Sequence, residues 1–159
     1  MRTLLVCAAI AILTSATGLR IATAAEMDPV VGTWKLDMGK SLFKAGPSIR
    51  SQTRTYSQSG EEITLEMKTV GVDGKEGTTH TTYQLNGKDY AVTGTPDYDS
   101  LSAKKINTRT AHFTLKKGGK IVGRSTRTVS KDGKKLTSTQ RLTTAMGGKT
   151  DYVLVFDKE

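Results

Sequence analysis

The chain has 159 residues, and its 24 lysines and arginines against 15 aspartates and glutamates give a formal net charge of +9. This length suits a single domain. One cysteine and two histidines exclude a disulfide scaffold and leave no cluster with the ligand spacing of a zinc site.

Residues 1–25 have the pattern of a cleaved secretory signal. Arg2 precedes an apolar stretch over residues 4–16, and small residues lead to an A-x-A-like cleavage site at residues 22–25. The stretch is too short for a membrane-spanning helix, which needs about twenty residues; a buried N-terminal helix is the alternative. Cys7 lies inside it, so the mature chain would contain no cysteine. We expect a periplasmic or secreted bacterial protein, for which nucleic acid is not an expected partner.

Alternating residues divide the expected mature chain, residues 26–159, into short strands. The first predicted strand covers residues 31–37, and a loop follows over residues 38–48. Nine further strands are predicted, at residues 49–58, 61–70, 77–85, 88–94, 99–106, 108–117, 120–130, 134–144 and 149–157. Threonine is abundant in them, and its branched Cβ favours extended backbone. No segment has a helical apolar period over three turns, so we expect an all-β domain.

Tight-turn signals separate most of these strands. They are Ser59-Gly60, Asp73-Gly74, Asn86-Gly87, Gly118-Gly119, Asp132-Gly133 and Gly147-Gly148. Such pairs supply the positive φ angles that two-residue hairpins require. The predicted fold is therefore an all-β, up-and-down antiparallel β-barrel of about 8–10 strands. A two-sheet sandwich would satisfy the same alternation and remains an alternative.

Two predicted strands place polar residues among the apolar residues of the inward face. One set is Leu136, Ser138, Gln140 and Leu142, and the other is Ile121, Gly123, Ser125, Arg127 and Val129. A solid core does not normally hold a residue such as Arg127, because an unpaired buried polar group costs about 1–3 kcal/mol. A cavity filled by water or a ligand tolerates it. The alternative is a bulge that shifts the register and turns Arg127 to the solvent.

The segment Gly32-Thr33-Trp34-Lys35-Leu36 resembles the calycin superfamily, which includes lipocalins, fatty-acid-binding proteins and avidins. These families open their first strand with Gly-x-Trp, and the resemblance implies that Trp34 plugs one end of the barrel. The length, the strand number and residues 155–159 are similar to fatty-acid-binding proteins. Residues 40–43 are similar to a Lys-Ser-x-Phe loop in lipocalin-like proteins of uncharacterised function that bacteria export.

The chain also departs from the fatty-acid-binding pattern. In those proteins the final strand carries Arg-x-Tyr, which grips the ligand carboxylate, but the matching positions here are Leu154 and Phe156. The family's other arginine matches Arg127. The segment after the first strand is too short for the family's helical lid. The resemblance therefore implies a cavity without this carboxylate grip, and an apolar ligand with a single polar contact fits these residues better.

We expect the barrel to bind a small hydrophobic or amphipathic molecule in its interior, as a monomer and without a cofactor. The expected apolar contacts are Trp34, Met67, Phe113, Leu154 and Phe156, and the expected polar contacts are Arg127, Gln140 and Tyr152. The basic charge also favours contact with an anionic membrane surface. The alternative is a filled barrel that acts as an interaction or inhibitor protein through its basic surface and open-end loops.

Catalysis and metal binding have little support in the sequence. His80 and His112 alternate with neighbouring threonines on outer faces. Asp97 and Asp99 flank Tyr98 in a turn, where aspartate is common, whereas a calcium site needs six to eight oxygen ligands. We therefore expect neither catalytic nor metal-binding residues. A barrel enzyme such as an isomerase is a third possibility, and it would need an inward-facing carboxylate or histidine.

Overall fold

The computed structural model describes residues 26–45 and 49–159, whose regular structure is entirely β-strand. The described residues form β1 (Gly32–Ala45), β2 (Ile49–Ser59), β3 (Glu62–Gly71), β4 (Glu76–Tyr83), β5 (Asn86–Thr93), β6 (Ser100–Asn107), β7 (Thr110–Lys117), β8 (Lys120–Val129), β9 (Lys135–Thr143) and β10 (Lys149–Lys158). The expected signal, residues 1–25, and the last part of the predicted loop, residues 46–48, lie outside the described residues.

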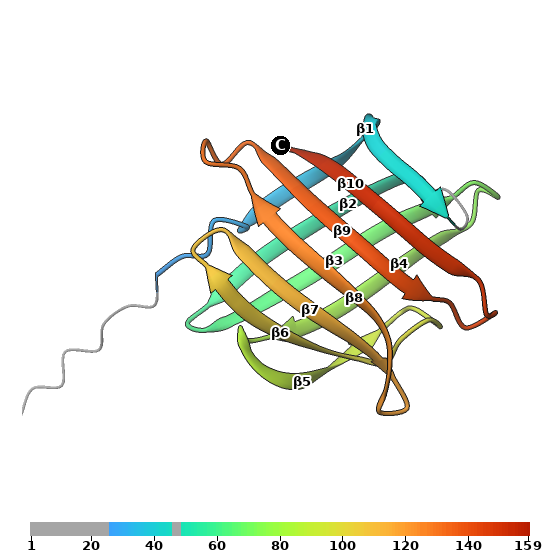
Figure 1. The fold of residues 1–159 in the computed structure, drawn as a ribbon. Helices are drawn as coiled ribbons and strands as arrows, with labels where there is room; N and C mark the ends of the chain where they lie inside the picture. Colours follow the sequence, from blue (N-terminus) through green and yellow to red (C-terminus); the bar gives the residue numbers. More distant parts are fainter. Residues whose placement is uncertain (1–25, 46–48) are drawn as a thin grey trace, which may run out of the picture.

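Consecutive strands pair antiparallel, and β1 pairs with β10 to close the sheet into a barrel (Figure 1). The predicted up-and-down barrel is confirmed, and the alternative of a two-sheet sandwich is wrong. Closure pairs the first strand with the last, so neither is left as an open sheet edge.

The glycines of the predicted turns adopt the expected backbone conformation. Gly60, Gly74, Gly118, Gly133 and Gly147 have φ angles between 54° and 80°. This left-handed region costs other residues about 1–2 kcal/mol. All five glycines lie in connections between consecutive strands, so they favour the observed reversals over continued extended chain.

The first strand is longer than the sequence predicts, because β1 continues to Ala45 where a loop is predicted from residue 38. Its register against β10 shifts after Asp37, so the strand bulges there. The Ser41 hydroxyl donates to the Asp37 carbonyl at 2.7 Å and accepts from the Val155 amide at 3.0 Å. These bonds satisfy backbone groups that the interrupted ladder leaves unpaired.

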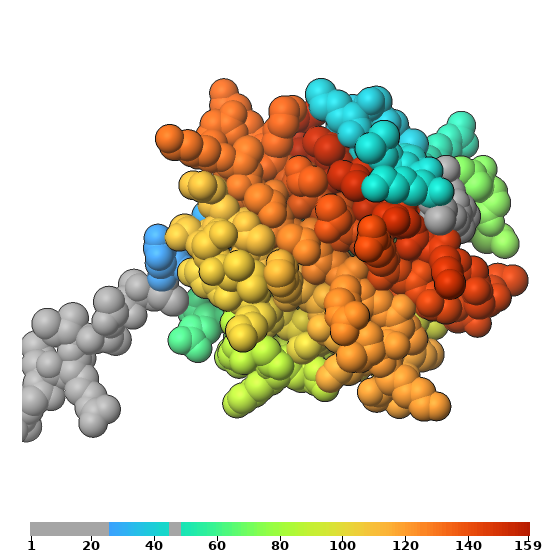
Figure 2. Space-filling view, viewed as in Figure 1, coloured from blue at the N-terminus to red at the C-terminus, as the bar shows by residue number. Residues whose placement is uncertain are grey.

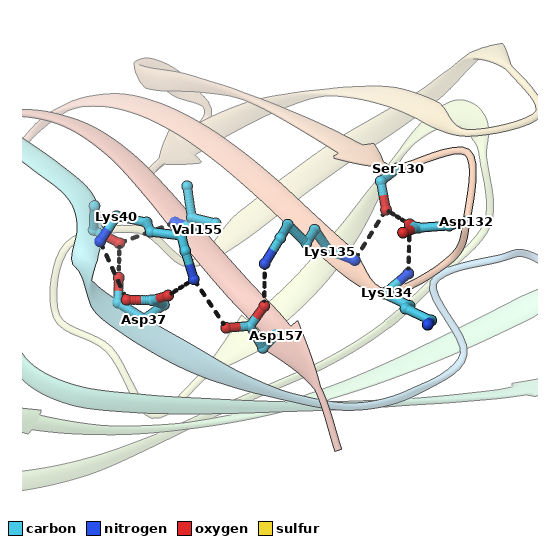
Figure 3. Close-up of polar contacts among 9 residues, drawn as sticks. Asp37, Lys40, Ser130, Asp132, Lys134, Lys135, Val155 and Asp157 are labelled. Carbon is cyan, nitrogen blue, oxygen red and sulfur yellow. Dashed lines mark hydrogen bonds and ion pairs between the residues drawn. The ribbon is translucent and has the colours of Figure 1, made fainter.

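Charged side chains also connect the bulged part of β1 to β9 and β10 (Figure 3). Lys40 forms ion pairs with Asp37 and Asp157, and Lys135 pairs with Asp157 as well. The Asp132 carboxylate accepts hydrogen bonds from within its own β8–β9 turn. These groups are partly exposed, and exposed ion pairs contribute about 0–1 kcal/mol each.

One end of the barrel, called here the closed end, contains residues 28–31, the C-terminus and the turns after β2, β4, β6 and β8. Trp34 is fully buried there, and its indole Nε1 donates to the Val30 carbonyl at 2.7 Å. The Lys158 ammonium lies 5.2 Å from the indole ring. Trp34 therefore packs at one barrel end, as the resemblance implies. The opposite end, called the open end, contains the turns after β3, β5, β7 and β9.

Alternation assigns the faces of β8 correctly except at its first residues. Arg127 and Val129 are buried as predicted, but Ile121 is 54% exposed and not inward-facing. The register between β7 and β8 shifts where Leu115 is followed by Lys116. This bulge breaks the period-two alternation, so residues before Gly123 no longer share the inward face.

Candidate ligand-binding site

An inner cavity of about 60 Å³ lies inside the barrel, with room for a few water molecules. It is lined by Arg54, Tyr56, Leu65, Met67, Tyr83, Tyr98, Leu101, Phe113, Leu115, Ser125, Arg127, Ser138 and Gln140. Apolar and aromatic side chains dominate this list, but two arginines and several hydrogen-bonding groups are among them. The predicted mixture of polar and apolar residues on the inward face is therefore observed.

A larger cavity of about 630 Å³ occupies the open end and is called here the mouth cavity. Its lining includes apolar side chains such as Ile49, Pro96 and Leu154 beside the hydroxyls of Thr79 and Thr150. The residues lining both cavities are Arg54, Met67, Tyr98 and Gln140. The two cavities therefore meet at these four side chains. The outer face that Figure 2 shows, with β8–β10 in orange to red, has a hollow of its own, a cavity of about 590 Å³ lined by residues such as Ile121, Arg124 and Val153. The mouth cavity lies at the barrel end.

Arg127 points into the barrel and is only 3% exposed, so the alternative in which it faces the solvent is wrong. Its Nη2 donates to both carboxylate oxygens of Asp28, at 3.0 and 3.1 Å, and its Nη1 donates to the Tyr83 hydroxyl at 2.9 Å. The rings of Phe113 and Tyr56 lie 5.7 and 5.8 Å from its guanidinium carbon. Asp28 therefore joins the end of the barrel to β8.

These contacts define what Arg127 can do. Burial acts to lower the pKa of Arg127, but Tyr83 and Asp28 raise it above its ordinary value. Its terminal nitrogens are held by Asp28 and Tyr83, while its buried Nε has no hydrogen-bond partner in the described part of the chain. Arg127 lines the inner cavity, but the Asp28 carboxylate already balances its charge.

Arg54 is a second buried arginine, and the sequence analysis did not identify it. It is 6% exposed; its Nε donates to Gln52 Oε1 at 2.8 Å, and its guanidinium carbon lies 4.5 Å from the centre of the Phe156 ring. No carboxylate within residues 26–45 and 49–159 lies at ion-pair distance from it. The alternation of Gln52, Arg54 and Tyr56 on the inward face of β2 is the sequence signal for it.

The β5–β6 loop holds Tyr98 where the two cavities meet. The Asp97 carboxylate accepts from the Ala145 amide, and the Asp99 carboxylate accepts from the Gly118 amide, both at 2.9 Å. The loop is thus tied to two neighbouring turns of the open end. Burial raises the pKa of Tyr98 to about 12, with Arg54 acting in the opposite direction. The phenol stays protonated at neutral pH and can donate a hydrogen bond.

The structure separates the predicted contact residues into three groups. Met67, Phe113, Arg127 and Gln140 line the inner cavity. Tyr152 and Leu154 line the mouth cavity, as do Met67 and Gln140. Trp34 and Phe156 are fully buried and line neither cavity. The ligand contacts of the first two groups stay predictions, whereas Trp34 and Phe156 pack within the core.

The two histidines lie on the outer surface, as the alternation predicts: His80 and His112 are exposed. In the part of the chain that the structure describes, no group of three or more histidine, cysteine, aspartate or glutamate side chains could hold a metal ion. Among the same residues there is no helix long and apolar enough to cross a membrane.

Comparisons with known proteins find likenesses among solved structures. No family model and no curated protein matches the chain. Among solved structures, the ileal bile acid-binding protein of zebrafish, in complex with cholic acid, aligns with a TM-score of 0.48 and 12% sequence identity. The alignment covers 82% of this chain and 99% of that chain.

Proposed function

We propose that the barrel binds a small hydrophobic or amphipathic molecule through its open end. The observation that carries this proposal is the mouth cavity of about 630 Å³, which meets the inner cavity at four shared side chains. Small-molecule sites in proteins usually have about 300–1,000 Å³ and combine apolar walls with a few polar groups. The mouth cavity has both properties.

Among the described residues, the lining of the inner cavity offers hydrogen-bonding groups and no usual acid–base group, whereas the carboxylates of Asp73, Glu76 and Asp97 line the mouth cavity. In the described chain, the residues around the inner cavity include tyrosines, arginines, serines and a glutamine, but no carboxylate or imidazole. General acid–base chemistry near neutral pH usually uses one of those two groups. Burying the apolar part of a ligand against Met67, Leu154 and Phe113 would contribute about 25 cal/mol per Å² removed from water.

Titration with the neutral fluorophore N-phenyl-1-naphthylamine tests this proposal. We expect the wild-type protein to bind it and Thr79→Phe to bind it about tenfold or more weakly, because overpacking a site costs about 1–3 kcal/mol. Thr79 is buried and lines the mouth cavity. His80→Phe is the matched control, since it places the same ring on the same strand but on the outer face. Thr150→Phe on β10 serves as a second blocking variant.

The same titration distinguishes a barrel that binds a small molecule from a filled barrel that acts through its surface. Equal affinity of the Thr79 and His80 variants would place the fluorophore outside the mouth cavity and contradict the proposal. A wild-type protein that binds neither this fluorophore nor any co-purified molecule would favour a filled barrel that acts through its basic surface.

We also propose that the protein is exported by a bacterium and works as a monomer. The N-terminal pattern at residues 1–25 supports the export, and in the cell envelope the basic chain would face anionic lipid. The full-length chain expressed in a bacterium should appear in the periplasmic fraction with the intact mass of residues 26–159. A cytoplasmic protein that retains residues 1–25 would contradict the export proposal.

A further inference from the structure

The two arginines that face the inner cavity differ in how their charges are balanced. Arg127 donates to both oxygens of Asp28 and has a neutral partner in Tyr83. Arg54 is nearly as buried, but its partner at Nε is the uncharged side chain of Gln52. Of these two buried cations, only Arg127 has a carboxylate partner in the described chain.

The carboxylates nearest to the open end do not supply the missing charge. Asp73, Glu76 and Asp97 line the mouth cavity, but none forms an ion pair with Arg54 in the described structure. The Asp73 carboxylate pairs with Lys75, and the Asp97 carboxylate accepts from a backbone amide. These groups reduce the positive potential of the mouth without contacting the guanidinium.

An uncompensated buried cation is unfavourable, because it loses hydration without gaining a counter-charge. Neither terminal nitrogen of Arg54 donates a hydrogen bond within the described chain, and the residue lines both cavities. An anion entering through the mouth would meet these nitrogens and form charge-assisted hydrogen bonds. We infer that Arg54 binds the anionic head group, a carboxylate or sulfonate, of an amphiphilic ligand whose apolar part lies in the mouth cavity.

The groups around Arg54 fit such a ligand. Tyr98 and Gln140 line both cavities beside Arg54, and each has a hydrogen-bond donor suited to an anionic oxygen. The apolar residues Met67 and Leu154 offer contacts for the rest of the molecule. This inference rests on the proposed function, since it names the chemical class of ligand for the same cavities.

Two fluorophores that differ by one charged group test the inference. N-phenyl-1-naphthylamine is neutral, and 8-anilinonaphthalene-1-sulfonate has the same aromatic frame with a sulfonate added. We expect Arg54→Met to weaken binding of the sulfonate about 10- to 100-fold, the usual range for a lost hydrogen bond to a charged group. Binding of the neutral fluorophore should change less than about twofold. Arg54→Met should also raise the thermal unfolding midpoint, because it removes an uncompensated charge.

The controls distinguish binding in the cavity from binding at the basic outer surface. Arg124→Met removes an exposed arginine from the outer face of β8 and should leave both affinities unchanged. Arg54→Lys keeps the charge and should retain part of the preference for the sulfonate. Decanoate should displace the sulfonate fluorophore from the wild-type protein, whereas millimolar sodium sulfate at equal ionic strength should not.

The binding results distinguish a failure of the proposed function from a failure of the inference about Arg54. A wild-type protein that binds neither fluorophore contradicts the proposed function and the inference together. Normal binding of the neutral fluorophore with an undiminished affinity of Arg54→Met for the sulfonate contradicts the inference alone. Displacement by sulfate but not by decanoate would assign the site to a small free anion and contradict the inference that the ligand is an amphiphile. If Arg54→Met does not fold, Arg54→Gln is used for the same comparison.

Discussion

Asp28→Asn is expected to lower the free energy of unfolding by about 3–5 kcal/mol, the usual cost of breaking one side of a buried ion pair. Asp28 and Arg127 are 9% and 3% exposed, and the carboxylate accepts two hydrogen bonds from the guanidinium. Asparagine keeps an oxygen that can accept from the Val30 amide, as Asp28 does at 2.9 Å. The substitution therefore removes mainly the charge that balances Arg127.

Urea unfolding, followed by circular dichroism, measures the effect. Asp89→Asn is the matched control, because it breaks an Asp–Lys pair with Lys116 on the outer surface, where the loss should be about 0–1 kcal/mol. Adding Arg127→Met to Asp28→Asn should restore most of the stability, since the unbalanced charge is then removed. A loss below about 1 kcal/mol for Asp28→Asn would mean that solvent reaches the pair through the cavity of about 340 Å³ that Asp28 lines at this end, and that Arg127 is hydrated without Asp28.

Most of the barrel could be predicted because residues close to one another in the sequence determine where each strand begins and ends. Glycine at the turns fixes where the chain reverses, and alternation between turns fixes which side chains point inward. Both signals involve residues that are near one another in the chain. Antiparallel pairing of consecutive strands follows from the short turns alone, and closure then requires only that the last strand meet the first.

The errors occur where distant strands decide the local path. Residues 38–45 contain glycine and charged residues, which favour a loop, yet pairing with β10 holds them extended as part of β1. Ile121 loses its inward position because of a bulge opposite β7. A bulge adds one residue to one strand of a pair, and neither strand's own alternation shows it.

The candidate site was predictable only in part, for the same reason. Alternation indicated that Arg127 faces inward, but its partner Asp28 is separated from it by 99 positions in the sequence and precedes the first strand. Arg54 lies on a strand with several polar residues, so its burial does not follow from that strand alone. Tyr98 reaches the cavity from a loop, where alternation makes no prediction. Which arginine has a counter-charge is a property of the folded barrel.

Gly94→Ala should disturb the mouth more than any other glycine substitution in a turn, with a loss of about 2–5 kcal/mol of unfolding free energy. Gly94 has a φ angle of +83°, and a Cβ atom there would lie 1.8 Å from the Thr78 carbonyl oxygen. The left-handed backbone costs alanine about 1–2 kcal/mol, and forced overpacking adds about 1–3 kcal/mol. To relieve the clash, β4 must move away from the loop that holds Tyr98.

Gly74→Ala isolates the steric part of this effect. Gly74 has a nearly identical φ angle of +79°, but a Cβ atom there would meet nothing within 4 Å. The control should therefore lose only the backbone cost and keep its affinity for N-phenyl-1-naphthylamine. Gly94→Ala should lose affinity as well as stability, because Thr79, next to the clash, and Tyr98, in the same loop as Gly94, both line the mouth cavity. Equal losses of stability in the two variants would show that the loop can move aside freely, and the mouth would then not be preorganised around its ligand.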